Sequence, residues 1–388
     1  MSAARPFRCD VAIAGGGPVG AALALALHAA GVDVVLLEAR DASKAPAPTA
    51  LRPLALSHGS RLIFERLGVW EAVTALGVTP IERIHVSQRG RFGRALLSAA
   101  AAKVPALGYV TDYSSLVAAL DAAVRDSGVT VVRGARVTSI AHDEASARVE
   151  FVTSAGGGDG VASLVAVADG SAAVSDVEVR TTDYGQSAII AIVTTDAPHR
   201  NLAYERFTPD GPLALLPFGS AYALVWTVRS DLAGDLAAIA PQAFIARLQE
   251  RFGARVRFTA VDSRAAQHLT LRVAERVDWG RAVLIGNAAQ ALHPVAGQGF
   301  NLGLRDAWEL SMEIKRQGAA DPALPRAYAS RRRIDRGGGI AFTDALIRIF
   351  SNDFAPLAVA RGAGLALLDA LPPAKDFVVR RMIFGSRG

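Results

Sequence analysis

A glycine-rich turn between two apolar stretches near the amino terminus constrains the fold of this chain most. Residues 11–14 (Val-Ala-Ile-Ala) predict a buried strand, and Gly15, Gly17 and Gly20 follow it in the pattern G-x-G-x-x-G. Residues 21–30, rich in alanine and leucine, then predict a helix. In this order, the first glycine allows a tight turn, the second lets the backbone approach a pyrophosphate, and the third packs helix against strand.

The helix start and a second strand complete the predicted dinucleotide site. Backbone N–H groups near Pro18 and Val19, and the positive end of the helix dipole, suit phosphate oxygens. Residues 32–37 predict the second strand, and Glu38 at its end is placed to accept hydrogen bonds from an adenosine ribose. Without both strands and the acid, the glycines could form an ordinary loop; with them, we expect an ADP-bearing cofactor. The predicted contacts here also include Ala39 and Arg40.

Composition excludes several other classes of protein. No apolar run reaches the roughly 18 uncharged residues of a membrane-spanning helix. The single cysteine cannot form an internal disulfide, so we predict a cytoplasmic protein. The net charge of +6 could suggest a polyanion, but the arginines are spread along the chain and we expect no nucleic-acid partner. The one cluster, Arg331 to Arg333, is expected to be a solvated helix face.

The middle of the chain predicts a second sheet. Residues 84–87 and 95–98 read as strands around a turn, and residues 155–160 as a glycine-rich hairpin tip. Four further strands are expected at 188–194, 204–207, 213–217 and 221–228. They predict one antiparallel sheet whose exposed face could cover a substrate. Candidates for that substrate contact are Tyr204, Arg206, Phe218 and Trp226, although aromatic residues at alternating positions could equally be core.

Two later segments return to the pattern of the first sheet. A buried strand at 164–168 ends in Asp169-Gly170, where the acid either caps the next turn or faces the cofactor. Residues 281–285 predict another strand, which leads into Gly286-Asn287. A glycine-rich loop, 293–300, then opens a helix predicted from Asn301 to Arg316. Backbone donors at such a helix start suit a phosphate or an electron-rich carbonyl.

These three anchors, in this order, resemble the flavoprotein aromatic hydroxylases, the group that includes para-hydroxybenzoate hydroxylase. Residues 286–306 (GNAAQALHPVAGQGFNLGLRD), with 204–208 and 211–217, are similar to the ubiquinone-biosynthesis hydroxylases of the 2-polyprenyl-6-methoxyphenol type. The resemblance implies an α/β fold: a Rossmann-like FAD-binding domain with an inserted antiparallel β-sheet substrate domain and a C-terminal helical segment. The expected divisions are FAD-binding parts at 1–80, 108–180 and 273–340, substrate-domain parts at 81–107 and 181–272, and the helical segment at 341–388.

The resemblance also implies site residues. The ADP part of FAD would lie against Gly15, Gly17, Pro18, Val19, Gly20, Glu38, Ala39, Arg40 and Arg52. Asp169, Gly170, Gly286 and Asn287 would follow toward the flavin, and Pro294, Gly297, Gln298, Gly299, Phe300 and Asn301 would lie beside its ring. His293 and Pro294 are the candidate catalytic residues, although His293 could be purely structural. Ala173 and Asp176 replace the Ser and Arg usual in the family, which leaves the electron donor, NADH or NADPH, open.

The implied reaction needs neither a metal nor a protein nucleophile. FAD accepts hydride, reacts with dioxygen at C4a, and the resulting hydroperoxide passes a hydroxyl group to an activated phenol. The histidines show no metal-ligand spacing. A polyprenylated phenol is nearly insoluble, so the enzyme would meet it at the inner face of a membrane or in a quinone-biosynthesis complex. Residues 354–384 could be an amphipathic docking element or a closing helix.

Other functions remain open from sequence. One is a related flavin enzyme, such as a halogenase, a prenyl-chain reductase or a monooxygenase of a small aromatic; the W-x-W-x-I-P motif of halogenases is absent. Another is a catalytically silent FAD-binding subunit of a quinone-biosynthesis assembly, which Ala173 and Asp176 would suit.

Overall fold

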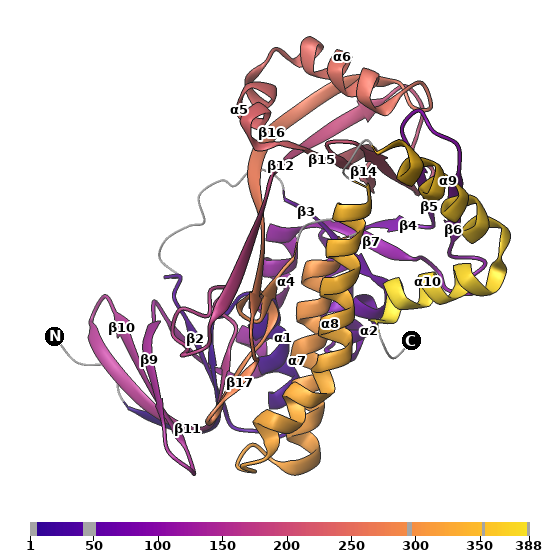
Figure 1. Ribbon diagram of the computed structural model, residues 1–388. Coiled ribbons are helices and arrows are strands. Elements are labelled where there is room, and N and C mark those ends of the chain that lie inside the picture. The colour runs from indigo at the N-terminus through magenta and orange to yellow at the C-terminus, as the bar shows by residue number, and fades with distance from the viewer. Residues whose placement is uncertain (1–5, 42–51, 293–296, 351–353, 386–388) are drawn as a thin grey trace.

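A five-stranded parallel sheet, extended by one antiparallel edge strand, organises the lower lobe of the molecule (Figure 1). The computed structural model describes residues 6–41, 52–292, 297–350 and 354–385. Across the sheet, the order is β17 (Asp278–Trp279), β18 (Ala282–Leu284), β11 (Gly156–Val167), β1 (Phe7–Ala14), β2 (Val34–Glu38) and β8 (Thr130–Arg133). Chain order reverses between β1 and β11, and ligands of such sheets bind in the crevice at that point.

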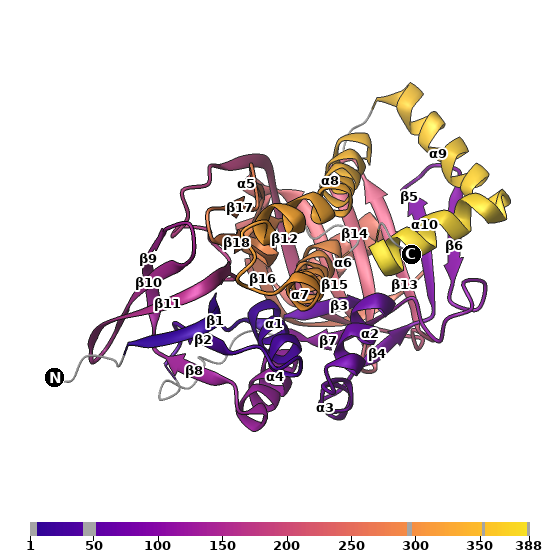
Figure 2. The same ribbon diagram turned by 90° about the horizontal axis from the view of Figure 1, so that it is seen from below.

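Three helices bury their apolar faces on the parallel sheet. They are α1 (Pro18–His28), α4 (Tyr113–Ser127) and α7 (Gln298–Gln317), which lie side by side in Figure 2. Leu23 on α1, Leu120 on α4 and Leu310 on α7 are fully buried in one core with the strands. The hairpin β9 (Arg136–His142) and β10 (Ala147–Thr153) extends the same sheet through β11. The predicted Rossmann-like domain is thus confirmed, and it is assembled from separate parts of the chain.

A second, mostly antiparallel sheet of eight strands forms the upper lobe. Its order is β19 (Gln290–Ala291), β16 (Phe258–Ala274), β12 (Val179–Thr195), β15 (Ala221–Arg229), β14 (Gly211–Phe218), β13 (Leu202–Thr208), β5 (Arg83–Gln88) and β6 (Arg94–Ser98). The long strands β12 and β16 run from the lower lobe into the upper one (Figure 1). Helices α5 (Ser230–Ala238) and α6 (Pro241–Phe252) cover one face of this sheet.

Smaller elements join the two lobes. A three-stranded sheet has the order β3 (Pro53–Ser57), β7 (Gly108–Asp112) and β4 (Thr79–Ile81), beside helices α2 (His58–Arg66) and α3 (Trp70–Ala75). A short 3₁₀ turn, η1 (Gly286–Ala288), follows β18. Long helix α8 (Leu324–Phe350) packs along α7, and α9 (Ala355–Ala370) and α10 (Pro372–Phe384) close the right side (Figure 1).

Among the described helices, none is both long and apolar enough to span a membrane alone. Residues Pro356–Ala370 and Pro372–Phe384 reach that length and apolarity only as a pair bent by 97°.

Three local predictions were wrong. Residues 156–160 belong to strand β11, because these glycines pair with β10 and leave only a two-residue tip. Helix α7 begins at Gln298, three residues earlier than predicted. Arg332 is only 3% exposed, so the arginine cluster is not simply a solvated face. Arg332 forms ion pairs with Asp306 and Asp335. The predicted domain boundaries stay predictions.

Candidate active site

A continuous cavity of about 1350 Å³ connects the two lobes. It begins at the carboxyl ends of β1, β2 and β11, passes the start of α7, and ends between the upper sheet and helices α8, α9 and α10. Most of the residues predicted to bind the cofactor line it: Gly15, Gly17, Pro18, Val19, Glu38, Ala39, Arg40, Arg52, Asp169, Gly170, Asn287, Gly297, Gly299 and Phe300. Residues from three distant segments of the chain therefore meet at one cavity.

The first glycine turn has little space for side chains except where a pyrophosphate is expected. Gly15 adopts a φ of +113°, and a Cβ there would lie 2.7 Å from the Ala168 backbone. A Cβ at Gly20 would overlap the Gly15 carbonyl oxygen, which explains the tight contact of α1 with β1. By contrast, no described protein atom lies within 4 Å of a Cβ built at Gly17. Gly17 also begins α1 without a side-chain cap, so the N–H groups of the first turn face open space.

Glu38 holds the second strand end against this turn. It is 6% exposed, and its Oε2 accepts a hydrogen bond of 2.7 Å from the Gly16 N–H. Its Oε1 accepts bonds from the backbone N–H and the Nε of Arg40, at 2.7 and 2.9 Å. Each carboxylate oxygen can accept more than one bond, so Glu38 retains capacity for a ribose hydroxyl.

Arg52 brings a positive charge, and Tyr113 an aromatic ring, to the same part of the cavity. The Arg52 guanidinium lies 4.7 Å from the centre of the Tyr113 ring, and both residues line the cavity. The Arg52 backbone N–H donates to Asp112 Oδ1 at 2.8 Å, which ties the two strand ends together. A guanidinium here is placed to attract the negative charge of a diphosphate.

Asp169 caps the turn that follows it, one of the two roles considered from sequence, and its contact with the cofactor stays a prediction. It lines the cavity, and its Oδ1 caps the following turn by accepting bonds from the N–H groups of Ser171 and Ala172 at 2.8 and 3.1 Å. On the far side of this loop, Arg272 donates to the Ser171 carbonyl at 2.7 Å and also lines the cavity. Arg272 was missed in the sequence because it lies inside a strand without a recognisable motif.

The Gly286-Asn287 loop is held by a buried group of charges. The Gly286 N–H donates to Asp306 Oδ2 at 3.1 Å, and Arg332 Nε donates to Asp306 Oδ1 at 2.7 Å. Burial would lower the pKa of Arg332, but the carboxylate of Asp306 raises it above its usual value. Asn287 faces the cavity. Asp306 is the last residue of the 286–306 motif, but its hydrogen-bond and ion-pair partners are visible only in the structure.

The glycine-rich helix start presents backbone donors to the cavity. Gly297, with a φ of +61°, begins α7 without a side-chain cap. Gly299 and Phe300 line the cavity next to it. His293 and Pro294, the predicted catalytic residues, lie outside the described residues, and their roles stay predictions.

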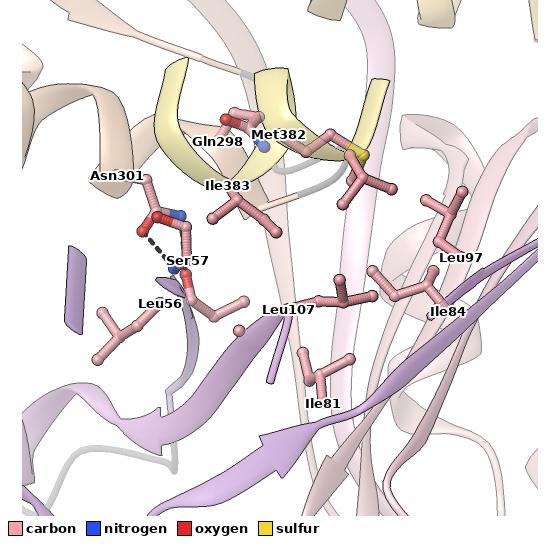
Figure 3. A pocket seen from close by; sticks show the side chains of 13 residues that line it. Leu56, Ser57, Ile81, Ile84, Leu97, Leu107, Gln298, Asn301, Met382 and Ile383 are labelled. Carbon is pink, nitrogen blue, oxygen red and sulfur yellow. Dashed lines mark hydrogen bonds between the residues drawn. The ribbon is translucent and has the colours of Figure 1, made fainter. Parts of the chain in front are cut away.

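The side chain of Asn301 is structural. Its Oδ1 accepts a bond from the Ser57 N–H at 2.8 Å (Figure 3). The same oxygen accepts a bond from the Ser60 hydroxyl at 2.7 Å, and the side-chain amide donates to the carbonyl groups of Ala55 and Gly297. Gln298 and Asn301 line a small adjoining pocket of about 60 Å³ with apolar residues of β3, β5 and α10 (Figure 3). Asn301 thereby locks β3 onto the start of α7.

The predicted substrate contacts divide between the two faces of the upper sheet. Trp226 packs on Phe244 of α6, and the Arg206 guanidinium lies 5.3 Å from the Phe252 ring, so both point away from the cavity. Tyr204 borders the cavity but packs its ring on Phe252 as well. Phe218 packs beside Ile81, Val110 and Ala203 near the cavity edge. Because strand side chains alternate, the neighbouring residues Ala203, Glu205, Phe207 and Val225 line the cavity instead.

The observed features fit FAD. An extended dinucleotide with an aromatic ring system would fit a cavity of this length. The cavity also offers two uncapped helix starts, open space at Gly17 and an acid at the end of the second strand.

Comparisons with known proteins give the same result. Residues 8–335 match the FAD binding domain family. The chain is 36% identical over 390 residues to ubiquinone hydroxylase UbiL of Rhodospirillum rubrum, covering 96% of this chain and 88% of that one. It is 30% identical over 374 residues to 3-demethoxyubiquinol 3-hydroxylase of Escherichia coli, covering 92% and 93%. The p-nitrophenol 4-monooxygenase PnpA of Pseudomonas putida shares the fold, with a TM-score of 0.77, 19% identity, and coverage of 98% and 100%. This chain therefore belongs to the FAD-binding flavoprotein hydroxylases and is an FAD-dependent monooxygenase.

Proposed function

We propose that this monooxygenase hydroxylates a polyprenylated phenol in ubiquinone biosynthesis, with NADH or NADPH as the reductant. The names of the relatives above support a quinone-related phenol and dioxygen as substrates. The observation that carries the proposal is the shape of the cavity. It continues past the start of α7 into an apolar arm, far beyond what a small phenol needs.

The apolar arm is built by the upper sheet and the C-terminal helices. Its wall is aliphatic and aromatic: Val86, Phe207 and Leu216 from the sheet, and Phe342, Leu346, Phe350, Leu357, Leu365, Leu368, Val378 and Met382 from the helices. Phe207 and Phe350 stack with ring centres 3.8 Å apart, which joins the sheet to the end of α8. Burying an isoprenoid chain there would gain about 25 cal/mol per Å² of apolar surface.

The protein residues have distinct roles in this reaction. When bound, FAD supplies the redox chemistry, accepting hydride from the nicotinamide and activating dioxygen for transfer of one oxygen atom. Gly15, Gly17 and Glu38 would hold its ADP part, and Asn287 would lie along its ribityl chain. The uncapped N–H groups after Gly297 would stabilise negative charge on the flavin ring. The apolar sheet face excludes water from the phenol ring.

The use of NADH or NADPH as electron donor is supported by features less specific than those that fit FAD. Ala173 and Asp176 replace the residues usual in the family, but Arg272 reaches the same loop from β16 and lines the cavity. We infer that Arg272 supplies a positive charge toward the reductant in place of the missing arginine. Comparing NADH with NADPH in the wild type and in Arg272→Gln would measure this contribution.

We also propose a peripheral membrane contact through α9 and α10. Four large apolar side chains here are exposed: Val359 (56%) and Leu367 (59%) on α9, Phe377 (69%) on α10, and Leu371 (45%) between the two helices. Arg380 is exposed on the same helix pair, which suits anionic lipid head groups. The arm of the cavity ends against these helices, so a lipid-soluble substrate would enter from the membrane. Sedimentation with vesicles containing phosphatidylglycerol, compared for wild type and Phe377→Ser, tests this contact.

The decisive experiment measures turnover. The FAD-loaded enzyme, with NADH or NADPH, should consume oxygen and form a hydroxylated product from a polyprenylphenol, detected by mass spectrometry. A methyl ether of the same compound is the control, because it lacks the activating hydroxyl group. Bound FAD that never turns over with any such phenol would support a silent subunit of a quinone-biosynthesis assembly instead.

A further inference from the structure

Glu205 is a charged residue in an otherwise apolar part of the cavity wall. It lies on β13, opposite Val86 of β5 and Ala214 of β14. The next residue of this row is Val225 on β15, and all four residues line the cavity. Along β13, the neighbours on the same face are Ala203 and Phe207.

These neighbours place Glu205 between the two ends of the cavity. Ala203 packs with Ile81 of β4, next to the FAD-binding lobe, whereas Phe207 stacks on Phe350 in the apolar arm. Successive residues on one face of a strand lie about 7 Å apart. Glu205 therefore lies about 7 Å from Ala203 and from Phe207, roughly the length of a phenol molecule. This places it where the part of the cavity proposed to bind FAD meets the apolar arm.

Nothing described in the protein satisfies this carboxyl group. The Oε1 atom of Glu205 is buried and has no hydrogen-bond partner among the described residues. Burial alone raises its pKa, from 4.5 to about 7, and no neighbouring charge contributes. Other charged side chains on the wall are engaged elsewhere: Arg361 with the carbonyl groups of Ile349 and Phe350, and His268 of β16 with Asp183. A buried polar atom without a partner costs about 1–3 kcal/mol, and a ligand that hydrogen-bonds to it in the cavity would offset this cost.

We propose that Glu205 binds the hydroxyl group of the phenol substrate and accepts its proton. This inference rests on the proposed function, since it names the residue that activates the ring. The phenol O–H bond breaks, an O–H bond forms on Glu205, and the charge moves to the phenolate. This proton transfer between the phenol and Glu205 changes no oxidation state, so it needs no oxidant or reductant. The phenolate is more electron-rich at its ring carbons, which favours their attack on an electrophilic oxygen.

The test separates binding from turnover with a soluble probe, 2-prenylphenol. Its affinity for the FAD-loaded enzyme is measured by ultraviolet absorbance and calorimetry between about pH 6 and pH 8. Wild-type affinity should rise with a midpoint near the pKa of Glu205, about 7. Glu205→Gln should remove this midpoint and lower the rate of hydroxylation by about 10²-fold or more, the usual effect of losing a general base. Glu205→Asp should restore part of the pH dependence.

Two controls keep the interpretation specific. The methyl ether of the probe should show no pH midpoint in any variant, because it has no proton to give. Glu82→Gln changes an exposed carboxylate that accepts a bond from Asn201, and should behave as wild type. Normal flavin absorbance in Glu205→Gln would show that the site is intact.

The outcomes distinguish this inference from the proposed function. If Glu205→Gln keeps the wild-type midpoint and rate, Glu205 is not the base. If the wild-type enzyme hydroxylates no prenylphenol, the proposed function fails, and probe binding alone decides the role of Glu205, because it needs no turnover.

Discussion

The two ends of the cavity are built in different ways. At the end proposed to bind FAD, backbone forms much of the wall: a turn around Gly15 and Gly17, a second turn leading into Asn287, and two uncapped helix starts. At the end proposed to bind the substrate, the wall is made of side chains from several strands of the upper sheet and from three C-terminal helices. A backbone cradle can hold only what its turns fit, whereas a side-chain wall can change with little effect on the fold. The first is suited to a common cofactor and the second to a particular substrate.

The largest expected effect comes from the glycines of the FAD end. Gly17→Val should leave a folded protein with a nearly normal melting temperature but no yellow flavin absorbance, because the added side chain would fill only the space reserved for the pyrophosphate. Gly20→Val should instead reduce the yield of folded protein, since its Cβ would overlap the Gly15 carbonyl. Absorbance and thermal denaturation separate the two. Full flavin content in Gly17→Val would contradict the proposed site.

The next effect concerns the charges beneath the Gly286 loop. Asp306→Ala removes one of the two carboxylates that pair with the buried Arg332. We expect a loss of about 3–5 kcal/mol in unfolding free energy, with weaker FAD binding as the loop loosens. Urea denaturation measures the first and flavin release the second. Glu309→Ala, on the same helix but paired at 3.4 Å with the partly exposed Arg331, is the control and should lose less than about 1 kcal/mol.

A smaller effect tests the apolar arm alone. Gly364 on α9 lines the cavity, and no described atom lies within 4 Å of a Cβ built there. Gly364→Leu should keep the fold but lower kcat/KM about tenfold for long-tailed phenols, equivalent to about 1.4 kcal/mol, with little change for 2-prenylphenol. Gly337→Leu on α8, equally open and outside the cavity wall, is the matched control. An equal loss of kcat/KM for short-tailed and long-tailed phenols would mean that the tail does not bind in the apolar arm.

The smallest effect is a pH dependence of stability. Because folding raises the pKa of Glu205 from 4.5 to about 7, its contribution to stability is fully present below pH 4.5 and is lost as the pH rises through about 7. Glu205→Gln should therefore raise the melting temperature of the substrate-free protein by roughly 2 °C at about pH 8 and much less at about pH 5. Scanning calorimetry at both values measures this. An equal shift at both would mean that Glu205 does not titrate in this range.

The comparison of the two ends also explains which parts of the cavity wall could be located from the sequence. The glycine turn, Glu38 and the strand ends at Asp169 and Asn287 were found from sequence, because strand, turn and helix signals lie within a few residues of each other. Arg206 and Trp226 were candidates either for substrate contact or for the core, and in the structure they face α6. Strand alternation identifies two faces but does not say which one another element will cover.

By itself, the sequence determined that this chain has a Rossmann-like FAD-binding lobe and a second sheet, because local periodicity and turn residues specify such elements. Only the tertiary structure decided that Arg332 is buried against Asp306, that Arg272 reaches the Asp169 loop, and that Glu205 faces the cavity. Each of these depends on contacts between residues far apart in the chain. Such contacts are fixed by packing of whole elements, which leaves no short-range signal to read.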